Sequence, residues 1–242
     1  MGSVYNGIPE EFALGIKKTN GLNCFIETGT CHGTTSAWAA EMFDKVFTIE
    51  LSHELAQIAG KNLNKYPNVT LMEGDSSVRL KEILNQIDDS PCMFWLDAHF
   101  SGDITSGENK NAPVFEELAL IMKCRGTHCI LIDDARFFVA PLSLNPNEYP
   151  GLAYLYSIVD FKRYSLYIVD DVLVLLPANN ANNTYVHSYV WKQDFLRSRR
   201  TFSFYWRALI NRNFKGFLVG LLLWLKLYKY KDKSCDLYFE KK

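Results

Sequence analysis

The chain has 242 residues, of which 48% are hydrophobic and 14% aromatic, and its formal net charge at pH 7 is −1. This length suits one large domain, or one domain with an appendage, and the apolar content excludes an intrinsically disordered chain. The near-neutral net charge argues against a protein that binds nucleic acid over its whole surface.

Short apolar runs alternate with segments of helical length over the first two thirds of the chain. The runs lie at 24–26, 46–49, 69–72, 93–96 and 129–132, and the expected helices at 34–43, 52–64, 76–85 and 113–123. The runs are continuously apolar or β-branched, as expected of strands covered on both faces. The alternation predicts an α/β fold with a doubly wound, mostly parallel sheet. Runs at 165–169 and 172–176 then predict a terminal hairpin, and 179–183 a loop.

Acidic residues follow all five parallel runs. They are Glu27, Glu50, Asp75, Asp97 and the pair Asp133-Asp134. In a sheet of this kind, ligands bind outside the carboxyl ends of the strands. These acids are therefore the first candidates for a functional site.

The loop after the first run contains Gly29 and Gly33, with Glu27 two residues before the first glycine. Glycines let the backbone turn sharply and approach a ligand closely. A dinucleotide fold requires G-x-G-x-x-G, with the pyrophosphate against the helix N-terminus, and this chain lacks it. The pattern favours a cofactor with a cationic amino-acid moiety over a nicotinamide cofactor. An ordinary strand-to-helix turn is the alternative.

Glu50, at the end of the second run, is placed to accept hydrogen bonds from both ribose hydroxyls of an adenosine. Enzymes that bind NAD use the same device, so Glu50 indicates a nucleoside rather than a methyl donor. Asp75 lies in Gly74-Asp75-Ser76 after the third run. It either holds the adenine amino group or caps the following helix.

The E-x-G-x-x-x-G loop, Glu50 and the G-D-S triplet together resemble the class I S-adenosylmethionine-dependent methyltransferases. The resemblance covers roughly residues 22 to 177 and implies a seven-stranded Rossmann-like sheet with S-adenosylmethionine as cofactor. It departs at Cys31, where many members have a middle glycine. The cofactor-binding residues that it implies are Glu27, Thr28, Gly29, Thr30, Gly33, Thr34, Thr35, Glu50, Leu51, Asp75, Ser76 and Asp97.

Asp97 and the pair Asp133-Asp134 follow the fourth and fifth runs, so we expect their carboxylates to converge. Clustered carboxylates repel unless a cation or proton intervenes, and oxygen ligands suit Mg²⁺ better than zinc. The segments Trp95-Leu96-Asp97-Ala98-His99 and Ile132-Asp133-Asp134-Ala135-Arg136 resemble the metal-dependent O-methyltransferases that act on macrolide and aminocoumarin sugars.

This second resemblance implies that Asp97, Asp133 and Asp134 hold Mg²⁺ or another divalent cation, which orients and acidifies a sugar hydroxyl. It makes Asp97 and His99 the candidate catalytic residues, with His99 as general base or, alternatively, as a structural histidine. The polar segment 100–112 is interpreted as a lid over the acceptor. Arg136 either binds an anionic part of the acceptor or pairs with a site carboxylate.

From residue 192 onward, basic and aromatic side chains dominate, around an apolar segment at 217–225. That segment is shorter than the roughly 20 apolar residues that span a bilayer. We expect a methyltransferase domain at 1–191 and a helical extension at 192–242. The extension packs as a terminal helix, forms a homo-oligomer contact, or rests on a membrane surface through its aromatic and basic side chains. Nucleic acid is not expected as a partner, because the catalytic part shows no matching basic surface.

Six cysteines are scattered without a Cys-x-x-Cys pair. Cys24, Cys92 and Cys129 lie in or beside apolar runs, where a thiol usually packs as a small core residue. This pattern favours a reducing compartment, and the N-terminus lacks the features of a signal peptide. We expect a cytoplasmic protein, peripheral at the inner face of the membrane if the extension docks there.

Together these observations predict an S-adenosylmethionine-dependent O-methyltransferase, assisted by a divalent metal, that acts on a sugar hydroxyl of a glycan or a glycosylated metabolite. Two alternatives stay open. The first is a metal-independent small-molecule methyltransferase. The second is a non-catalytic glycan-binding or membrane-adaptor protein built on the same scaffold.

Overall fold

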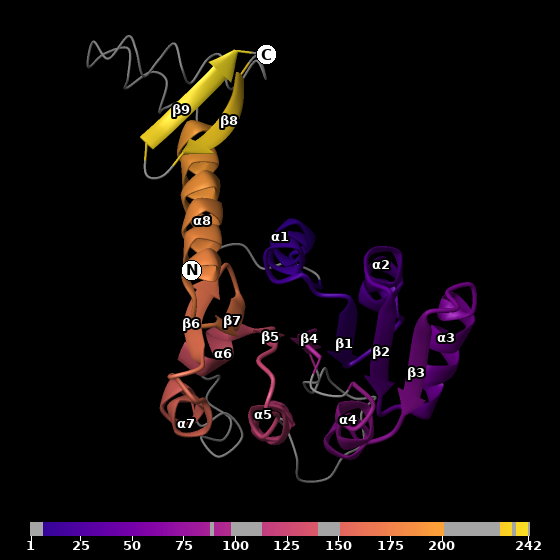
Figure 1. Cartoon of the computed structure of the whole chain (residues 1–242). Coiled ribbons are helices and arrows are strands. Elements are labelled where there is room, and N and C mark those ends of the chain that lie inside the picture. The colour runs from indigo at the N-terminus through magenta and orange to yellow at the C-terminus, as the bar shows by residue number, and fades with distance from the viewer. Residues whose placement is uncertain are drawn as a thin grey trace. The chain divides into compact units, whose positions relative to one another are not determined.

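The computed structural model describes residues 7–87, 90–97, 113–139, 151–200, 228–233 and 236–241. The chain divides into two compact units, Met1–Asn182 and Asn183–Lys242. The first unit contains a seven-stranded sheet with the strand order β3-β2-β1-β4-β5-β7-β6 (Figure 1). Its strands are β1 (Cys24–Thr28), β2 (Lys45–Glu50), β3 (Val69–Glu73), β4 (Cys92–Leu96), β5 (Cys129–Ile132), β6 (Tyr164–Val169) and β7 (Val172–Pro177).

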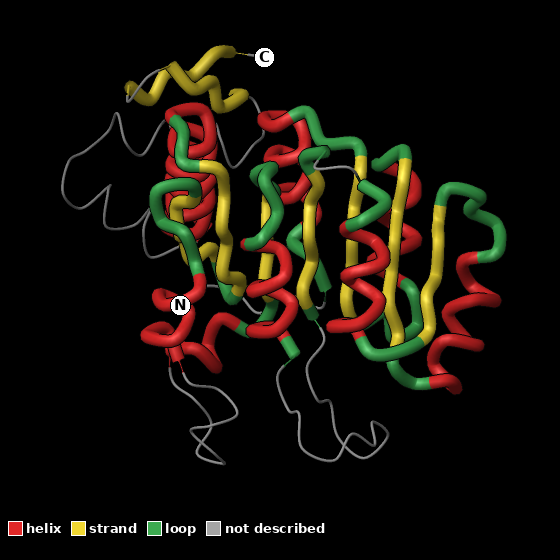
Figure 2. The backbone as a smooth tube through the Cα atoms, turned by 60° about the horizontal axis from the view of Figure 1, so that its bottom comes forward, coloured by secondary structure: helices red, strands yellow, loops and turns green. Residues whose placement is uncertain are grey.

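The five strands from β1 to β5 run parallel, and β7 is antiparallel to both β5 and β6. Each of the seven runs that were predicted to be strands falls within one of these strands, and Asp170 and Asp171 form the turn between β6 and β7. The predicted doubly wound, mostly parallel sheet of seven strands is therefore confirmed. Figure 2 shows the alternation of strands and helices along this unit.

Helices cover both faces of the sheet. One face carries α1 (Glu10–Asn20), α2 (Thr34–Met42) and α3 (His53–Leu63), and the other carries α4 (Ser76–Leu84), α5 (Val114–Met122) and α7 (Gly151–Ile158) (Figure 1). A short helix, α6 (Ala135–Val139), follows β5 and contacts α7. Strands that are buried on both faces need no polar alternation, which explains their continuous apolar runs.

The core is built on both faces from the central strands. Ile26, Phe94 and Ile130 face α4 and α5, where Leu80 and Leu118 are completely buried. On the opposite face Phe25 packs against Phe43 at a ring-centroid distance of 5.2 Å, and edge-on against Trp38 at 6.1 Å. Such aromatic pairs add about 0.5–1.5 kcal/mol beyond the area they bury.

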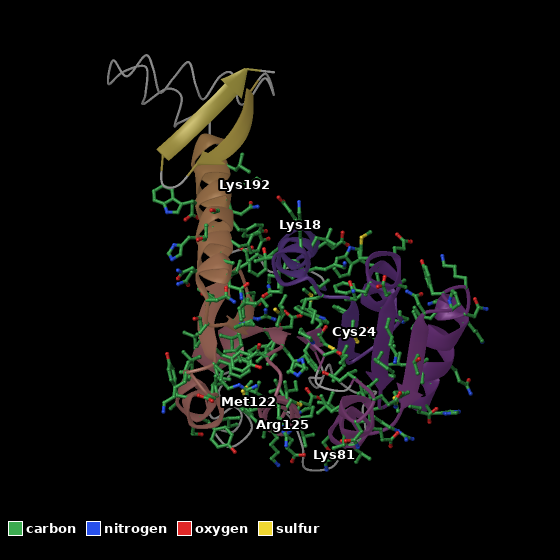
Figure 3. All side chains as sticks on the ribbon, viewed as in Figure 1. Lys18, Cys24, Lys81, Met122, Arg125 and Lys192 are labelled. Carbon is green, nitrogen blue, oxygen red and sulfur yellow. The ribbon has the colours of Figure 1, made fainter. Side chains whose placement is uncertain are left out.

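Three cysteines of the strands behave as expected of core residues. Cys92 and Cys129 are buried, and Cys24 is partly buried opposite Cys92 in the register of β1 and β4. Figure 3 shows Cys24 within the sheet, between the two layers of helices. Cys235 lies outside the described residues.

The second unit was only partly predicted. α8 (Asn180–Arg200) begins inside the stretch 179–183, so the predicted loop there is wrong. The helical prediction for the extension holds for 192–200 but is wrong for 228–241, where β8 (Tyr228–Lys233) pairs antiparallel with β9 (Asp236–Lys241). Tyrosine and lysine alternate along β8, which is the period-2 pattern of a strand. The apolar segment 217–225 lies outside the described residues, and the functional boundary at 191/192 stays a prediction.

None of the described helices combines the length and the apolar character that crossing a bilayer requires.

Candidate functional site

The carboxyl ends of the central strands are locked together by backbone hydrogen bonds. The Asp97 N–H donates to the Thr28 carbonyl at 3.1 Å, and the Asp133 N–H donates to the Leu96 carbonyl at 3.1 Å. On the other side of β1, the Gly29 N–H donates to the Ile49 carbonyl at 3.0 Å. The loops that follow β1, β2, β4 and β5 therefore begin at one level of the sheet, where the predicted site residues lie.

The loop from Gly29 to Gly33 makes a sharp turn into α2. Its two glycines have φ values of 86° and 80°, and Cys31 between them has a φ of 51°. A Cβ atom on Gly33 would lie 3.0 Å from the Leu63 side chain, which would have to shift by a few tenths of an ångström, and the positive φ would strain any other residue there. Cys31 thus occupies a left-handed conformation that favours glycine, which is the residue that the resemblance expects at this point.

Glu27 is a buried carboxyl group, 1% exposed, at the end of β1. The Ser36 and Thr48 hydroxyls donate hydrogen bonds to its Oε2 atom, the latter at 2.8 Å. Burial raises the pKa of Glu27 to about 8, and the nearby Asp97 carboxylate adds to the rise, while the Ser36, Thr48 and Thr35 hydroxyls oppose it. The structure therefore brings Glu27, Asp97 and Thr35, all predicted site residues, into one neighbourhood.

Thr30 and Thr34 complete the first loop. Thr30 is 3% exposed, and its hydroxyl lies 2.6 Å from that of Thr48. Thr34 is the first residue of α2. Both residues belong to the loop that the sequence predicts around the cofactor.

Glu50 ends β2 with both carboxylate oxygens engaged by backbone donors. Oε2 accepts from the Cys31 N–H at 2.7 Å, and Oε1 accepts from the Ser52 N–H at 2.9 Å. Each oxygen retains a lone pair, so the carboxylate can still accept ligand hydroxyls. Leu51 beside it is 55% exposed. Glu50 thus joins the first loop to the second and presents a carboxylate held in a fixed orientation.

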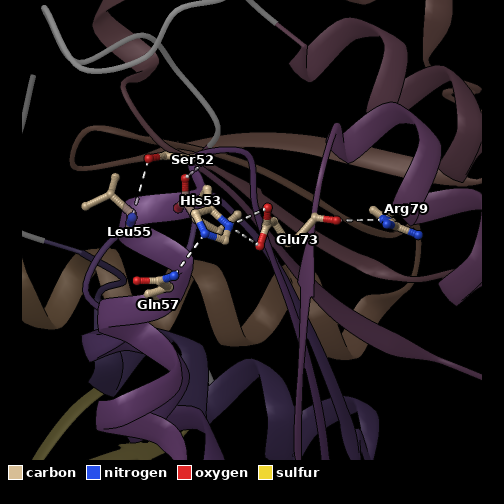
Figure 4. A network of polar contacts seen from close by, with 7 residues as sticks. Ser52, His53, Leu55, Gln57, Glu73 and Arg79 are labelled. Atoms are coloured by element: carbon tan, nitrogen blue, oxygen red, sulfur yellow. Dashed lines mark hydrogen bonds and ion pairs between the residues drawn. The ribbon is translucent and has the colours of Figure 1, made fainter.

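Polar contacts also join the start of α3 to the end of β3. In Figure 4 the His53 ring points toward Glu73, with Nδ1 at 2.9 Å from Oε1, and Arg79 Nε donates to the Glu73 carbonyl at 2.8 Å. Ser52 caps α3 by accepting from the Leu55 N–H at 3.4 Å. These exposed contacts restrain the rim next to Glu50 and Leu51.

Asp75 caps α4. Its Oδ1 atom accepts from the Ser77 N–H at 2.8 Å and from the Ser77 hydroxyl at 2.6 Å. Of the two interpretations that the sequence left open, the cap is confirmed, and a contact with an adenine amino group stays a prediction. Ser76, which follows, is 8% exposed.

The three predicted metal ligands follow β4 and β5, and one of them is paired with an arginine. Asp97 and Asp133 follow adjacent strands at paired positions, because Leu96 and Ile132 are partners in the register of β4 and β5. Asp134 has a φ of 57°, and its Oδ1 atom lies 2.6 Å from Arg136 Nη2. Within the described part of the chain, no group of three or more His, Cys, Asp or Glu side chains could hold a metal ion. The predicted three-carboxylate centre is therefore not shown.

Arg136 is held between two carboxylates. Besides its contact with Asp134, the Arg136 guanidinium forms an ion pair with Asp171 from the β6–β7 turn. The backbone N–H of Arg136 also donates to Asp171 Oδ1 at 3.0 Å. Of the two roles that the sequence left open for Arg136, pairing with a site carboxylate is the one observed. His99 and the predicted lid at 100–112 lie outside the described residues.

Glu117 is a residue of this region that the sequence analysis missed. It lies in α5, is completely buried, and its Oε2 atom accepts from the Thr28 hydroxyl at 3.2 Å. Burial raises its pKa to about 7, and the Ser76 and Thr28 hydroxyls oppose the rise. The one available signal was an acid between Phe115 and Leu118 in an apolar helix, at a position that periodicity assigns to the core.

The chain is similar to several solved structures. The chain matches a Staphylococcus aureus protein named as a candidate caffeoyl-CoA O-methyltransferase, with 18% identity, a TM-score of 0.51, and coverage of 73% of this chain and 86% of that one. It also matches an O-methyltransferase from Bacillus cereus in complex with SAH, with 18% identity, a TM-score of 0.49, and coverage of 72% and 84%. An SAH-bound Podospora anserina methyltransferase matches with 16% identity, a TM-score of 0.48, and coverage of 72% and 80%.

At these identities the first match shows the fold, which is the Rossmann-like fold of the class I methyltransferases. No protein-family model matches the sequence, and a comparison with curated proteins finds no match either.

The burial of Glu27 predicts a pH-dependent stability. Its folded pKa of about 8 exceeds the ordinary value of 4.5, so the folded state holds a proton that the unfolded state has released between these pH values. This makes the free energy of unfolding fall as the pH rises from about 5 to 8. Glu27→Gln removes this titration. The free energy of unfolding of the variant minus that of the unchanged protein should therefore rise from pH 5 to pH 8, as measured by urea unfolding. Glu54→Gln, at an exposed carboxylate, is the control, and a difference equal at pH 5 and pH 8 would contradict the assignment.

Proposed function

We propose that this chain is an S-adenosylmethionine-dependent O-methyltransferase whose donor site lies at the carboxyl ends of β1, β2 and β3. The observation that carries the proposal is the pair of carboxyl groups, Glu27 and Glu50, held on the two sides of the Gly29–Gly33 turn. Glu50 accepts from the Cys31 N–H of that turn, and Glu27 accepts from Ser36 just beyond it.

The acidic groups of this region suit such a donor. S-adenosylmethionine carries a sulfonium and an ammonium but no phosphate, and the carboxyls of Glu27 and Asp97 lie in one neighbourhood. A bound cation would favour the charged form of Glu27, whose pKa burial raises to about 8. Glu50 would accept hydrogen bonds from the ribose hydroxyls, as acids at this strand end do for adenosine cofactors. The exposed side chain of Leu51 would offer an apolar surface to the adenine.

The reaction itself is a single displacement. The acceptor oxygen forms a bond with the methyl carbon as the carbon–sulfur bond breaks, S-adenosylhomocysteine leaves, and the proton of the hydroxyl passes to a base. Asp97 would position that hydroxyl, and His99 is the base proposed from the sequence. Because the sulfonium is already a strong electrophile, the positioning of the two reactants supplies most of the rate.

For the acceptor we propose a sugar hydroxyl, on the resemblance carried by Asp97, Asp133 and Asp134. The residues fit a divalent cation only in part. Asp97 and Asp133 offer oxygen ligands from adjacent strand ends, whereas Asp134 is engaged by Arg136. When bound, a divalent cation would acidify the acceptor hydroxyl.

For the basic and aromatic extension we propose docking on an anionic membrane surface, which would suit a lipid-linked glycan acceptor. The one-sided charge of the sequence after residue 192 supports this proposal. A contact between copies of the chain is the alternative for the same segment.

Donor binding is tested by calorimetry with S-adenosylhomocysteine. Glu50→Ala removes the ribose acceptor and should weaken binding at least tenfold, because a hydrogen bond to a charged group contributes about 1.5–3 kcal/mol. Glu54→Ala changes an exposed carboxylate in the next helix and serves as the control. If the unchanged protein does not bind S-adenosylhomocysteine, the adaptor alternative is favoured; binding of NADH instead would indicate an oxidoreductase.

Metal assistance is tested separately, with labelled donor and a panel of candidate glycans analysed by mass spectrometry. We expect methyl transfer to fall at least tenfold in EDTA and to recover with added Mg²⁺. Binding of S-adenosylhomocysteine should be unaffected by EDTA. Transfer that proceeds equally well in EDTA would establish the metal-independent alternative and leave the donor site intact.

The proposed membrane contact is tested by co-sedimentation with vesicles that contain anionic phospholipid. We expect the full chain to bind such vesicles, less tightly at high salt, and a chain that ends at residue 191 to lose binding. Equal sedimentation of the two chains, or none by either, would contradict the contact. Size-exclusion chromatography of the same two chains would reveal an oligomer contact instead.

A further inference from the structure

Glu117 is a carboxyl group that the proposed methyl transfer does not use, and it lies directly behind the proposed donor site. Its Oε2 atom accepts from the Thr28 hydroxyl at the end of β1. The Ser76 hydroxyl at the start of α4 also stabilises its charged form. Thr28 ends β1 and Ser76 begins α4, and Glu117 is the side chain that joins these two elements of the proposed site.

The end of β1 is held on both faces of the sheet. Successive residues of a strand point to opposite faces, so Glu27 and Thr28 diverge. On one face Ser36 and Thr48 bond to Glu27, and on the other Glu117 bonds to Thr28. The backbone between the two contacts leads directly into the Gly29–Gly33 turn.

Packing alone does not explain a glutamate at this position. Its neighbours on the buried side of α5 are Phe115, Leu118 and Ile121, and an apolar side chain would fit the same layer. The Oε1 atom of Glu117 is buried and has no hydrogen-bond partner among the described residues. A buried carboxyl group that is only partly satisfied costs stability relative to an apolar residue of similar size.

The electrostatic surroundings make that cost larger. The groups that act on Glu117 are the hydroxyls of Thr28 from β1 and Ser76 from α4, and the carboxylates of Asp75 before α4 and Glu116 in its own helix. Neither carboxylate compensates its charge, and burial is the largest cause of its raised pKa. A group that is unfavourable for folding and bonded to two proposed site residues is best explained by its effect on those residues.

We propose that Glu117 is a positioning residue that sets the end of β1 and the start of α4 at the separation required by the adenosine part of the methyl donor. This proposal rests on the proposed function. Glu117 acts through the Thr28 and Ser76 hydroxyls and does not itself contact the donor.

Two substitutions separate positioning from stability. Glu117→Leu replaces the carboxyl group by an apolar side chain of similar size, and we expect its free energy of unfolding to equal or exceed that of the unchanged protein. Its affinity for S-adenosylhomocysteine should fall at least tenfold, because both hydroxyls lose their acceptor. Thr28→Val should weaken binding in the same direction, and the double variant should show less than the sum of the two effects.

The pH dependence provides a readout that a merely structural role would not produce. At pH 8 the Glu117 carboxylate is mostly charged, and at pH 6 it is mostly protonated, given a pKa of about 7. Glu117→Gln is neutral at both. Hydrogen bonds to a charged group are stronger, so this variant should bind about fivefold less tightly than the unchanged protein at pH 8 and nearly equally at pH 6. At each pH the affinity of the variant is divided by that of the unchanged protein. This ratio cancels the effect of the titration of Glu27, because Glu27 is present in both proteins.

The experiment is calorimetry with S-adenosylhomocysteine at pH 6 and pH 8 on the full chain and these variants, with urea unfolding of each. Glu54→Gln, at an exposed carboxylate that is not among the groups acting on Glu117, is the matched control and should bind as the unchanged protein does. Affinity that falls while stability is kept supports the proposal. Equal affinity in all variants, or affinity and stability that fall together in Glu117→Leu, overturns the role of Glu117 alone. Failure of the unchanged protein to bind overturns the donor site and this proposal with it.

Discussion

Parallel strands that end at the same level are the constraint on which the rest of this structure depends. The pairing of Thr28 with Leu96, and of Leu96 with Ile132, brings the ends of β1, β4 and β5 together. The backbone hydrogen bonds donated by Asp97 and Asp133 extend β4 and β5 by one residue each. Loops that begin at a common level can share a ligand although their residues are far apart in sequence. The carboxyl groups of Glu27 and Asp97 act on each other for this reason, at a separation of 70 residues in the chain.

The sheet could be predicted because both of its faces are covered. Strands such as 93–96 and 129–132 are apolar at every position, and the helices between them have the length that a right-handed crossover needs. The predicted runs accordingly fall within the observed strands. Signals were weaker for elements outside residues 24–132, where apolar runs and helices alternate. The helices α1, α6 and α7 were not predicted, and the alternation of tyrosine and lysine in β8 was overlooked within a segment defined by its composition.

The site could be predicted only as far as chain position determines it. Glu50 ends β2. Its role in joining two loops depends on the backbone N–H groups of Cys31 and Ser52, which lie within hydrogen-bond distance of its carboxylate. Asp134 also follows a strand, but its left-handed backbone directs it to Arg136, and Asp171 from a distant turn completes that cluster. The role of Glu117 could not be predicted either, because its partners Thr28 and Ser76 come from the end of β1 and the start of α4. Nothing in the sequence of α5 indicates these partners.

The pairing of Arg136 bears on how negative charge is managed at these strand ends. Three carboxylates that converge without a cation would repel one another, which is why the sequence suggested a metal. In the structure, a guanidinium already neutralises part of this charge, since Arg136 binds both Asp134 and Asp171. Arginine remains charged at every working pH and binds carboxylates through a planar fork, so it fixes the β5–α6 loop against the β6–β7 turn. Asp97 follows β4, the strand paired with β1, whereas Asp133 follows β5, one strand farther from Glu27. Arg136 therefore supplies, at the end of β5, part of the neutralisation for which the sequence suggested a metal.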